Sequence, residues 1–433
     1  MKILISGGMV IDPAVGFEGI ADLLIEDGLI VDIVKPGEGP KNAEVYDAKG
    51  YIVAPGLCDI HTHLREPGYE YKETIATGTR AAAAGGVTSL ACMANTDPVN
   101  DNGSVTDYII KRAKSDGVVR VYPVGAVTRG LKGEALAEIG ELKESGAVAI
   151  SDDGKVIADS DLMRRGLEYA LTFDLPVITH SEDMSLVGEG VMNEGFASTE
   201  LGLPASPSGA EEIMIFRDVT LARITGARLH VAHVTTAGGV RIIREAKKDG
   251  VRVTAETCPH YFTLTDDAVR SFDTNTKVNP PLRSKKDQKA VIEGLKDGTI
   301  DIIASDHAPH NIDEKAVEFI YAKSGMIGLE TLLPLSLSLY HEKKLTLMAV
   351  IKKLTDEPAK IIGIPAGTFR RKSTADIVVF DPDEEWVCDP ARFFSKSKNT
   401  PFAGATLKGK VKLTFVAGNL VYKNGSIVAQ SNA

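Results

Sequence analysis

Histidines that follow apolar runs are the feature of this sequence that points most directly to chemistry. The chain has nine histidines in 433 residues, and His61 and His63 stand two positions apart at the end of one such run. Residues two apart on a strand point to the same side, so these imidazoles converge. His180 and His233 each end a further apolar run. A core histidine with a satisfied hydrogen bond explains any one ring. Four together indicate metal ligands, because imidazole fills an apolar core at high cost.

Two carboxylates extend this set. Asp306 follows the β-rich run that ends at Ser305, and Asp153 comes two residues after the run that ends at Ser151. Each could instead cap a helix or form a turn, as Asp often does after a strand. Asp152 is adjacent to Asp153, so the sequence leaves open which of the two faces the centre.

Imidazole and carboxylate ligands without thiolate suit zinc, with manganese or cobalt as substitutes. The four cysteines are far apart and form no CxxC pair, which argues against a thiolate site or a disulfide framework. Zinc brings the pKa of a bound water to about 7, which makes hydroxide available as a nucleophile. Four histidines and two carboxylates exceed one catalytic site, so we expect two metals that share a hydroxide and a carboxylate.

The elements that must position these residues alternate along the chain. Eight apolar, β-rich runs are each followed by sequence with helical character. The expected strands are Leu57 to His61, Thr88 to Met93, Arg120 to Ala126, Ala147 to Ser151, Pro176 to His180, Leu229 to His233, Arg252 to Thr257 and Ile300 to Ser305. The expected helices include 73–84, 105–113, 133–144, 159–172, 211–225, 238–248 and 285–295. This alternation predicts an α/β fold with a (β/α)8 TIM barrel, whose active site lies at the carboxyl ends of the strands.

An open doubly wound sheet is the alternative fold. The sequence has neither a GxGxxG motif after a strand nor a GxxxxGK[ST] motif, which disfavours nucleotide-binding versions of it.

Both ends of the chain carry β-branched runs separated by turns. These are Lys2 to Ile5, Ala21 to Glu26, Leu29 to Val34 and Glu44 to Asp47, and later Ala375 to Phe380, Val411 to Val416 and Leu420 to Lys423. We expect residues 1–53 and 372–433 to form one small, discontinuous β-sandwich domain, and residues 54–371 to form the barrel.

The bulk properties narrow the class of partner. The net charge is −10 with no basic stripe, which argues against nucleic-acid binding and for a small molecule. The N-terminus lacks the apolar region of a signal peptide, and no run approaches the ~18 apolar residues of a membrane span. We therefore expect a cytoplasmic protein with reduced thiols.

Several local motifs together resemble the amidohydrolase superfamily and, within it, the bacterial type I dihydroorotases. The similarity extends over nearly the whole chain. Its motifs are His61-Thr62-His63-Leu64-Arg65-Glu66-Pro67-Gly68, Met93-Ala94-Asn95-Thr96, Ser151-Asp152-Asp153-Gly154, Asn279-Pro280-Pro281-Leu282-Arg283, Ser305-Asp306-His307-Ala308-Pro309-His310 and Gly328-Leu329-Glu330-Thr331.

The resemblance implies a role for each candidate ligand. His61 and His63 would hold one zinc ion, and His180 and His233 the second. Asp153 would bridge the pair, where many relatives have a carboxylated lysine. Asp306 would ligate and also serve as general base and acid.

The same resemblance implies substrate contacts. Arg65 and Asn95 would clamp a substrate carboxylate, a role that suits guanidinium and amide donors. The other implied contacts are His63, Asn279, His310 and the backbone of Ser324 and Gly325. Arg65 could instead be a surface ion-pair partner, and the two asparagines could be turn residues. His260 is assigned only to the surroundings of the metal centre.

The implied activity is the reversible cyclisation of N-carbamoyl-L-aspartate to (S)-dihydroorotate in pyrimidine synthesis. A hydantoinase or allantoinase is the first alternative, although an uncharged hydantoin gives a carboxylate clamp nothing to bind. The second is a non-catalytic structural partner of aspartate transcarbamoylase. Some type I enzymes need that partner for activity, so association with it is expected alongside catalysis, as is a homo-oligomer.

Overall fold

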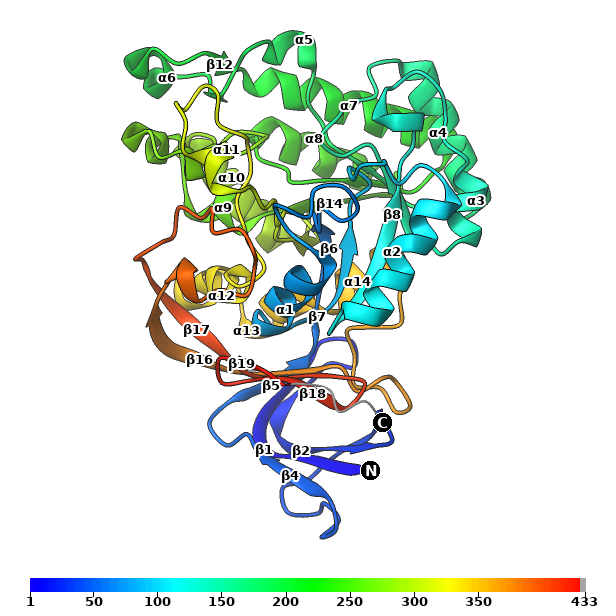
Figure 1. Cartoon of the computed structure of the whole chain (residues 1–433), viewed down its shortest axis with the longest axis vertical. Helices are drawn as coiled ribbons and strands as arrows, with labels where there is room; N and C mark the ends of the chain where they lie inside the picture. Colours follow the sequence, from blue (N-terminus) through cyan, green and yellow to red (C-terminus); the bar gives the residue numbers. More distant parts are fainter. Residues whose placement is uncertain (429–433) are drawn as a thin grey trace.

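A ring of eight parallel strands forms the centre of the computed structural model, which describes residues 1–428 (Figure 1). The strands are β6 (Leu57–Thr62), β7 (Val87–Cys92), β8 (Arg120–Gly125), β9 (Ala149–Ser151), β10 (Val177–Thr179), β13 (Leu229–Val231), β14 (Val253–Thr257) and β15 (Ile302–Ile303). They pair in that order, and a bridge between Thr62 and His307 joins the first edge to the last. The expected barrel and its eight strands are confirmed.

Helices surround this ring. They are α1 (Ile75–Ala84), α2 (Gly103–Asp116), α3 (Ile139–Glu144), α4 (Ser160–Thr172), α7 (Ser208–Thr225), α8 (Ala237–Lys248), α10 (Lys285–Asp297), α12 (Leu332–His341), α13 (Leu347–Leu354) and α14 (Asp356–Ile362). Side chains that accept hydrogen bonds from the first helical turn fix several starts, among them Asp159 for α4, Thr236 for α8 and Ser284 for α10.

The loops at the carboxyl ends of the strands hold short elements. They are α5 (Met184–Val187), β11 (Met192–Asn193), α6 (Phe196–Leu201), β12 (Ala205–Ser206), α9 (Pro259–Thr263) and α11 (Ile312–Lys315), with 3₁₀ turns at Arg129–Leu131, Asp266–Ser271 and Thr274–Thr276. A further 3₁₀ turn, Pro390–Arg392, lies nearer the C-terminus, after the barrel.

The helix expected over residues 133–144 was wrong in its first half, since only Ile139–Glu144 is helical. Gly133 has a φ of +66°, which is left-handed and interrupts a helix, and Leu136 forms a β-bridge with Thr128 instead.

Strands from both termini form one mixed sheet at one end of the molecule (Figure 1). It contains β1 (Lys2–Asp12), β2 (Phe17–Glu26), β3 (Leu29–Val34), β4 (Glu44–Asp47), β5 (Ile52–Pro55), β16 (Ile377–Val387), β17 (Thr406–Val416), β18 (Asn419–Lys423) and β19 (Ser426–Ile427). β5 joins the two halves, because it pairs with β1 on one side and β16 on the other. We call this the terminal sheet.

The terminal sheet has a core of its own and a second face against the barrel. Along β16, Ile377 and Val379 pack with the N-terminal strands, whereas Val378 and Phe380 join the large core of the barrel. Alternate residues of a strand point to opposite faces, so one strand serves both cores. The division into residues 1–53 with 372–433, and 54–371, stays a prediction. No helix in the described residues is long and apolar enough to cross a membrane.

Candidate active site

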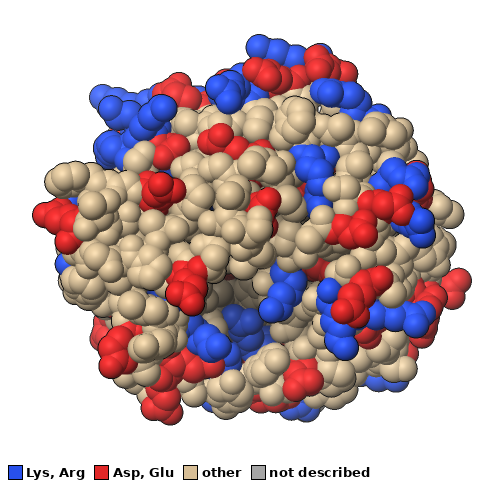
Figure 2. Space-filling model, turned by 90° about the horizontal axis from the view of Figure 1, so that it is seen from above, with Lys and Arg blue, Asp and Glu red and all other residues tan. Residues whose placement is uncertain are grey.

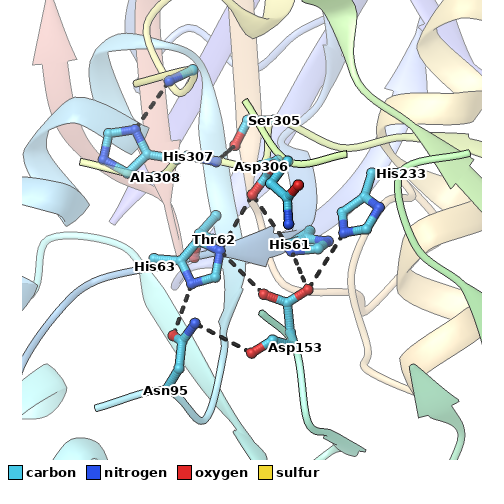
Figure 3. Close-up of polar contacts among 12 residues, drawn as sticks. His61, Thr62, His63, Asn95, Asp153, His233, Ser305, Asp306, His307 and Ala308 are labelled. Carbon is cyan, nitrogen blue, oxygen red and sulfur yellow. Dashed lines mark hydrogen bonds and ion pairs between the residues drawn. The ribbon is translucent and has the colours of Figure 1, made fainter. Parts of the chain in front are cut away.

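The carboxyl ends of the barrel strands bring all six predicted ligands to one place, and Figure 3 labels five of them, His61, His63, Asp153, His233 and Asp306. None of them is more than 7% exposed. His61 Nε2 lies 3.4 Å from Asp153 Oδ1, and His63 Nε2 lies 3.3 Å from Asp306 Oδ1. His180 Nδ1 and His233 Nε2 face each other at 2.9 Å. Side chains from five different strand ends therefore meet, as a barrel with this order requires.

The two adjacent aspartates have different surroundings. Asp153 Oδ1 lies 3.5 Å from both His180 Nδ1 and His233 Nε2. Asp152 turns away and accepts hydrogen bonds from the backbone N–H groups of Val127 and Thr128, at 2.8 and 3.0 Å. Asp153 is thus the one that faces the centre, and Asp152 holds the preceding loop.

The donor set fits a cation. His61 Nε2 and Asp153 Oδ1 are buried and have no hydrogen-bond partner among residues 1–428, and buried polar atoms in proteins are normally paired. Two groups of side chains can each offer three ligand atoms within 4.8 Å of one another, namely His61 with His63 and Asp306, and His61 with Asp153 and His233. Neutral imidazole and carboxylate are the ligands of catalytic zinc sites.

Both central carboxylates are held in their ionised form. Burial alone would raise the pKa of Asp153, but His61 with His180 and His233 keeps it well below the usual range. Burial opposes ionisation of Asp306 too, yet His61 and His63 lower its pKa to about 2. Two ionised carboxylates thus lie in a buried space, where a cation can pair with them.

A cavity of about 230 Å³ opens onto this centre. It is lined by His63, Arg65, Asn95, Asp153, Gly154, His180, His233, Asn279, Asp306, Ala308, His310, Ser324 and Gly325. Every residue that the sequence suggested as a substrate contact is among them. Arg65 donates from Nε to the carbonyl oxygen of Pro309 at 3.3 Å, and His310 Nε2 lies 2.9 Å from the carbonyl oxygen of Ser324. The guanidinium and the amide of Asn95 thus lie on the wall of the cavity that holds the metal ligands.

The molecular surface agrees with a small, charged ligand. On the face in Figure 2, basic and acidic side chains are interspersed, and Lys and Arg side chains lie at the floor of a hollow. No continuous basic stripe crosses that face.

Comparison with known proteins gives the family. A model of the dihydro-orotase-like family matches residues 50–238. A dihydroorotase of Syntrophus aciditrophicus (strain SB) is 58% identical over 424 residues, which cover 98% of this chain and 100% of that protein. A dihydroorotase of Geobacter metallireducens is 57% identical over 423 residues, with the same coverage. The chain belongs to the dihydroorotase family. The resemblance inferred from the motifs is confirmed.

Solved structures support the fold of this dihydroorotase-family chain. L-Hydantoinase (dihydropyrimidinase) from Arthrobacter aurescens superimposes with a TM-score of 0.89 at 24% identity, covering 99% of this chain and 97% of that one. Dihydropyrimidinase from Brevibacillus agri NCHU1002 gives 0.87 at 27% identity, covering 99% and 96%. These hydantoinase structures thus share the fold of this chain, but their sequences are much less similar to it than those of the dihydroorotases.

Two glutamates next to the centre were missed from the sequence. Glu256 contacts His61 Nδ1 through one oxygen, and its other oxygen lies 3.1 Å from His230 Nε2. Glu182 Oε2 lies 2.8 Å from His180 Nε2. A carboxylate on the far nitrogen of a ligand histidine fixes its tautomer and orientation. Two sequence signals could have identified them. Glu256 stands inside an apolar strand, and Glu182 comes two residues after a histidine that ends a strand.

His260 lies beside the centre as expected. Its Nε2 has no hydrogen-bond partner in the described chain, and with Cys258 and Asp306 it forms a third group of possible ligand atoms. Burial lowers the pKa of His260 to about 4, which keeps the ring neutral near pH 7.

Proposed function

We propose that this dihydroorotase-family chain interconverts N-carbamoyl-L-aspartate and (S)-dihydroorotate with zinc as its metal. The observation that carries the proposal is one cavity lined by Arg65, Asn95 and five of the six predicted ligands, with the sixth, His61, beside Asp153. A cyclic amide that also bears a carboxylate is the substrate class this combination suits, because each half of the cavity then has a group to bind. The dihydroorotase relatives, identical at more than half of all positions, support the same substrate.

The metal centre is proposed to hold two zinc ions. His61 and His63 would hold one and His180 and His233 the other, with Asp153 between them and Asp306 beside the first. Bound zinc lowers the pKa of a coordinated water toward neutrality and polarises the carbonyl under attack. Asp153 and Asp306 supply the anionic charge that such a pair of cations needs.

Asp306 is proposed as the general base and acid. Its carboxylate is ionised at neutral pH and lies on the cavity wall. In the hydrolytic direction it takes the proton of the attacking water and delivers it to the leaving ring nitrogen. Arg65 and Asn95 bind the substrate carboxylate, while Asn279, His310 and the Ser324–Gly325 backbone orient the ring. His63 contacts the substrate from the metal side.

A substrate panel with metal analysis tests this function. The purified chain should turn over dihydroorotate, with little activity on allantoin or hydantoin, and should contain about two zinc ions. Arg65→Gln should raise KM for dihydroorotate by about 10- to 100-fold, since a hydrogen bond to a charged group contributes about 1.5–3 kcal/mol. Equal turnover of hydantoin, or a chain that binds no divalent metal, would contradict the proposal.

We further propose a cytoplasmic homo-oligomer that also associates with aspartate transcarbamoylase. The four cysteines are free and buried, as is usual in a reducing compartment. Helix α7 exposes Ile213, Phe216 and Ile224 at 51%, 62% and 68%, an apolar stripe that suits a subunit contact. Light scattering with and without added transcarbamoylase checks both associations, and a monomer in both samples would contradict them.

A further inference from the structure

The segment between β16 and β17 reaches from the terminal sheet to the mouth of the barrel. We call residues 393–400 of this segment the strap. One strap residue, Asn399, is 5% exposed and uses its whole side chain. Its Oδ1 accepts a hydrogen bond from His310 N at 3.1 Å, and its Nδ2 donates to the carbonyl oxygens of Ala308 and Gly325, both at 3.1 Å.

These bonds join two separate walls of the substrate cavity. Ala308 and His310 belong to the loop after β15, whereas Gly325 lies fifteen residues beyond His310 in the loop before α12. One isolated β-bridge, between His307 and Met326, also joins the two loops, and Asn399 adds three side-chain bonds beside it. Asn399 does not line the cavity itself. It therefore acts on the substrate site only through the residues it holds.

The two loops approach each other closely where Asn399 ties them. Gly325 has a φ of +133°, and a Cβ there would lie 2.8 Å from Ala308 Cβ. The neighbouring residues of the two loops are also in contact, since His310 Nε2 lies 2.9 Å from the carbonyl oxygen of Ser324. A small change in loop separation thus moves both the imidazole and the backbone that faces the substrate ring.

The strap is anchored at a second point, so its position is not free. Ser395 donates from Oγ to Glu73, and the backbone N–H of Lys396 also donates to Glu73. Glu73 in turn lies 3.3 Å from His307 Nε2, next to Asp306 in the chain. The terminal sheet is thereby connected to the loop after β15 at both ends of the strap.

We propose that Asn399 is a positioning residue that sets the separation between His310 and the Ser324–Gly325 backbone, and so the fit of the substrate ring. This inference rests on the proposed function for the role of those three residues. Only a side-chain amide offers one acceptor and two donors on a planar group, as these three bonds demand. Removing it takes away the partner of the His310 N–H and of the Ala308 carbonyl, whereas the Gly325 carbonyl still accepts from Lys315 Nζ at 3.1 Å.

Steady-state kinetics on three variants test the proposal. Asn399→Ala should raise KM for dihydroorotate by about 10-fold or more, with kcat changed by less than about 3-fold and zinc content unchanged. Asn399→Asp keeps the shape and the acceptor but loses both donors, so it should raise KM as well. Thr400→Val is the control, because among residues 1–428 the Thr400 hydroxyl accepts only from Phe402 N, within the same segment. It should leave KM unchanged.

Hydrogen exchange gives a readout independent of the substrate. The amide of His310, which donates to Asn399 Oδ1, should exchange at least about 10-fold faster in Asn399→Ala than in the wild type or Thr400→Val. Wild-type KM together with unchanged exchange in Asn399→Ala would overturn the proposal. A wild-type chain inactive on dihydroorotate would instead sink the proposed function, while the exchange rates would still decide whether Asn399 holds the two loops.

Discussion

Phe415 in the terminal sheet and Asp153 at the carboxyl end of the barrel are both buried, yet their surroundings differ in kind. Phe415 is fully buried and packs edge-on against Tyr46, with ring centroids 5.0 Å apart. Asp153 is surrounded by imidazoles, and one of its oxygens has no hydrogen-bond partner in the described chain. The first arrangement lowers the free energy of the folded chain. The second leaves one buried oxygen without a hydrogen-bond partner, which a bound cation would supply.

Among substitutions at the barrel site, Asp306→Ala should cause the largest loss of activity. Loss of the general base and acid should lower kcat by about 10³-fold or more, with a much smaller change in substrate affinity. Turnover and zinc content of the purified variant check this.

Asp301→Ala is the matched control for Asp306. Asp301 stands at the other end of β15 and binds Lys247 and the backbone N–H of Ala255. This variant should lose stability but keep its turnover. Wild-type kcat in a zinc-loaded Asp306→Ala enzyme would contradict the assigned role.

Phe415→Ala should give the largest effect on the terminal-sheet side. A large buried side chain replaced by alanine costs about 3–5 kcal/mol of unfolding free energy. Urea denaturation measures the loss, and kcat of the folded enzyme should stay within about 2-fold of wild type. Val387→Ala, at a position 61% exposed on β16, should cost less than about 0.5 kcal/mol. Equal losses in the two variants would show that the sheet core does not carry stability.

Glu256→Gln should weaken zinc binding without opening the fold. Replacing a carboxylate that orients a ligand histidine typically costs about 10- to 100-fold in metal affinity. Competition with a chromogenic chelator measures it. Glu211→Gln is the control, since Glu211 is equally buried but binds Thr235 and Thr236. If both variants lost affinity equally, the effect would come from general destabilisation.

Substitution of Glu330, which lies between the barrel and the strap, should cause the smallest change, and that change is in stability. Its Oε1 accepts from the backbone N–H groups of Phe394 and Ser395, and burial raises its pKa to about 8 from the ordinary 4.5. The folded state therefore keeps a proton that the unfolded state releases. The contribution of Glu330 to the free energy of unfolding is complete below about pH 4.5 and is lost as the pH rises toward 8.

A glutamine at position 330 cannot ionise. The free energy of unfolding of Glu330→Gln should therefore rise relative to wild type between about pH 4.5 and 8, by on the order of 1 kcal/mol at pH 8 after solvent screening. Denaturation at pH 5, 6.5 and 8 checks the trend. A difference that does not vary with pH would count against a protonated Glu330.

Much of the fold could be predicted because its signals are local. Each barrel strand is a short apolar run, and each ligand histidine directly follows or ends one, so His61, His180 and His233 could be placed on one face without any long-range information. The helix over 133–144 failed because a glycine and a bridge from Thr128 to Leu136 override helical character, and only the folded chain brings those two residues together.

The sequence by itself determined the barrel, the residue types of the metal centre and the family motifs, because strand periodicity and ligand chemistry are properties of neighbouring residues. Only the tertiary structure decided that Asp153 and not Asp152 faces the centre, that Glu256 and Glu182 orient two of the histidines, and that Asn399 ties the cavity walls together. The physical reason is that hydrogen bonds between residues far apart in the chain depend on where the fold places them. Asn399 and His310 are 89 positions apart, and no local pattern records their contact.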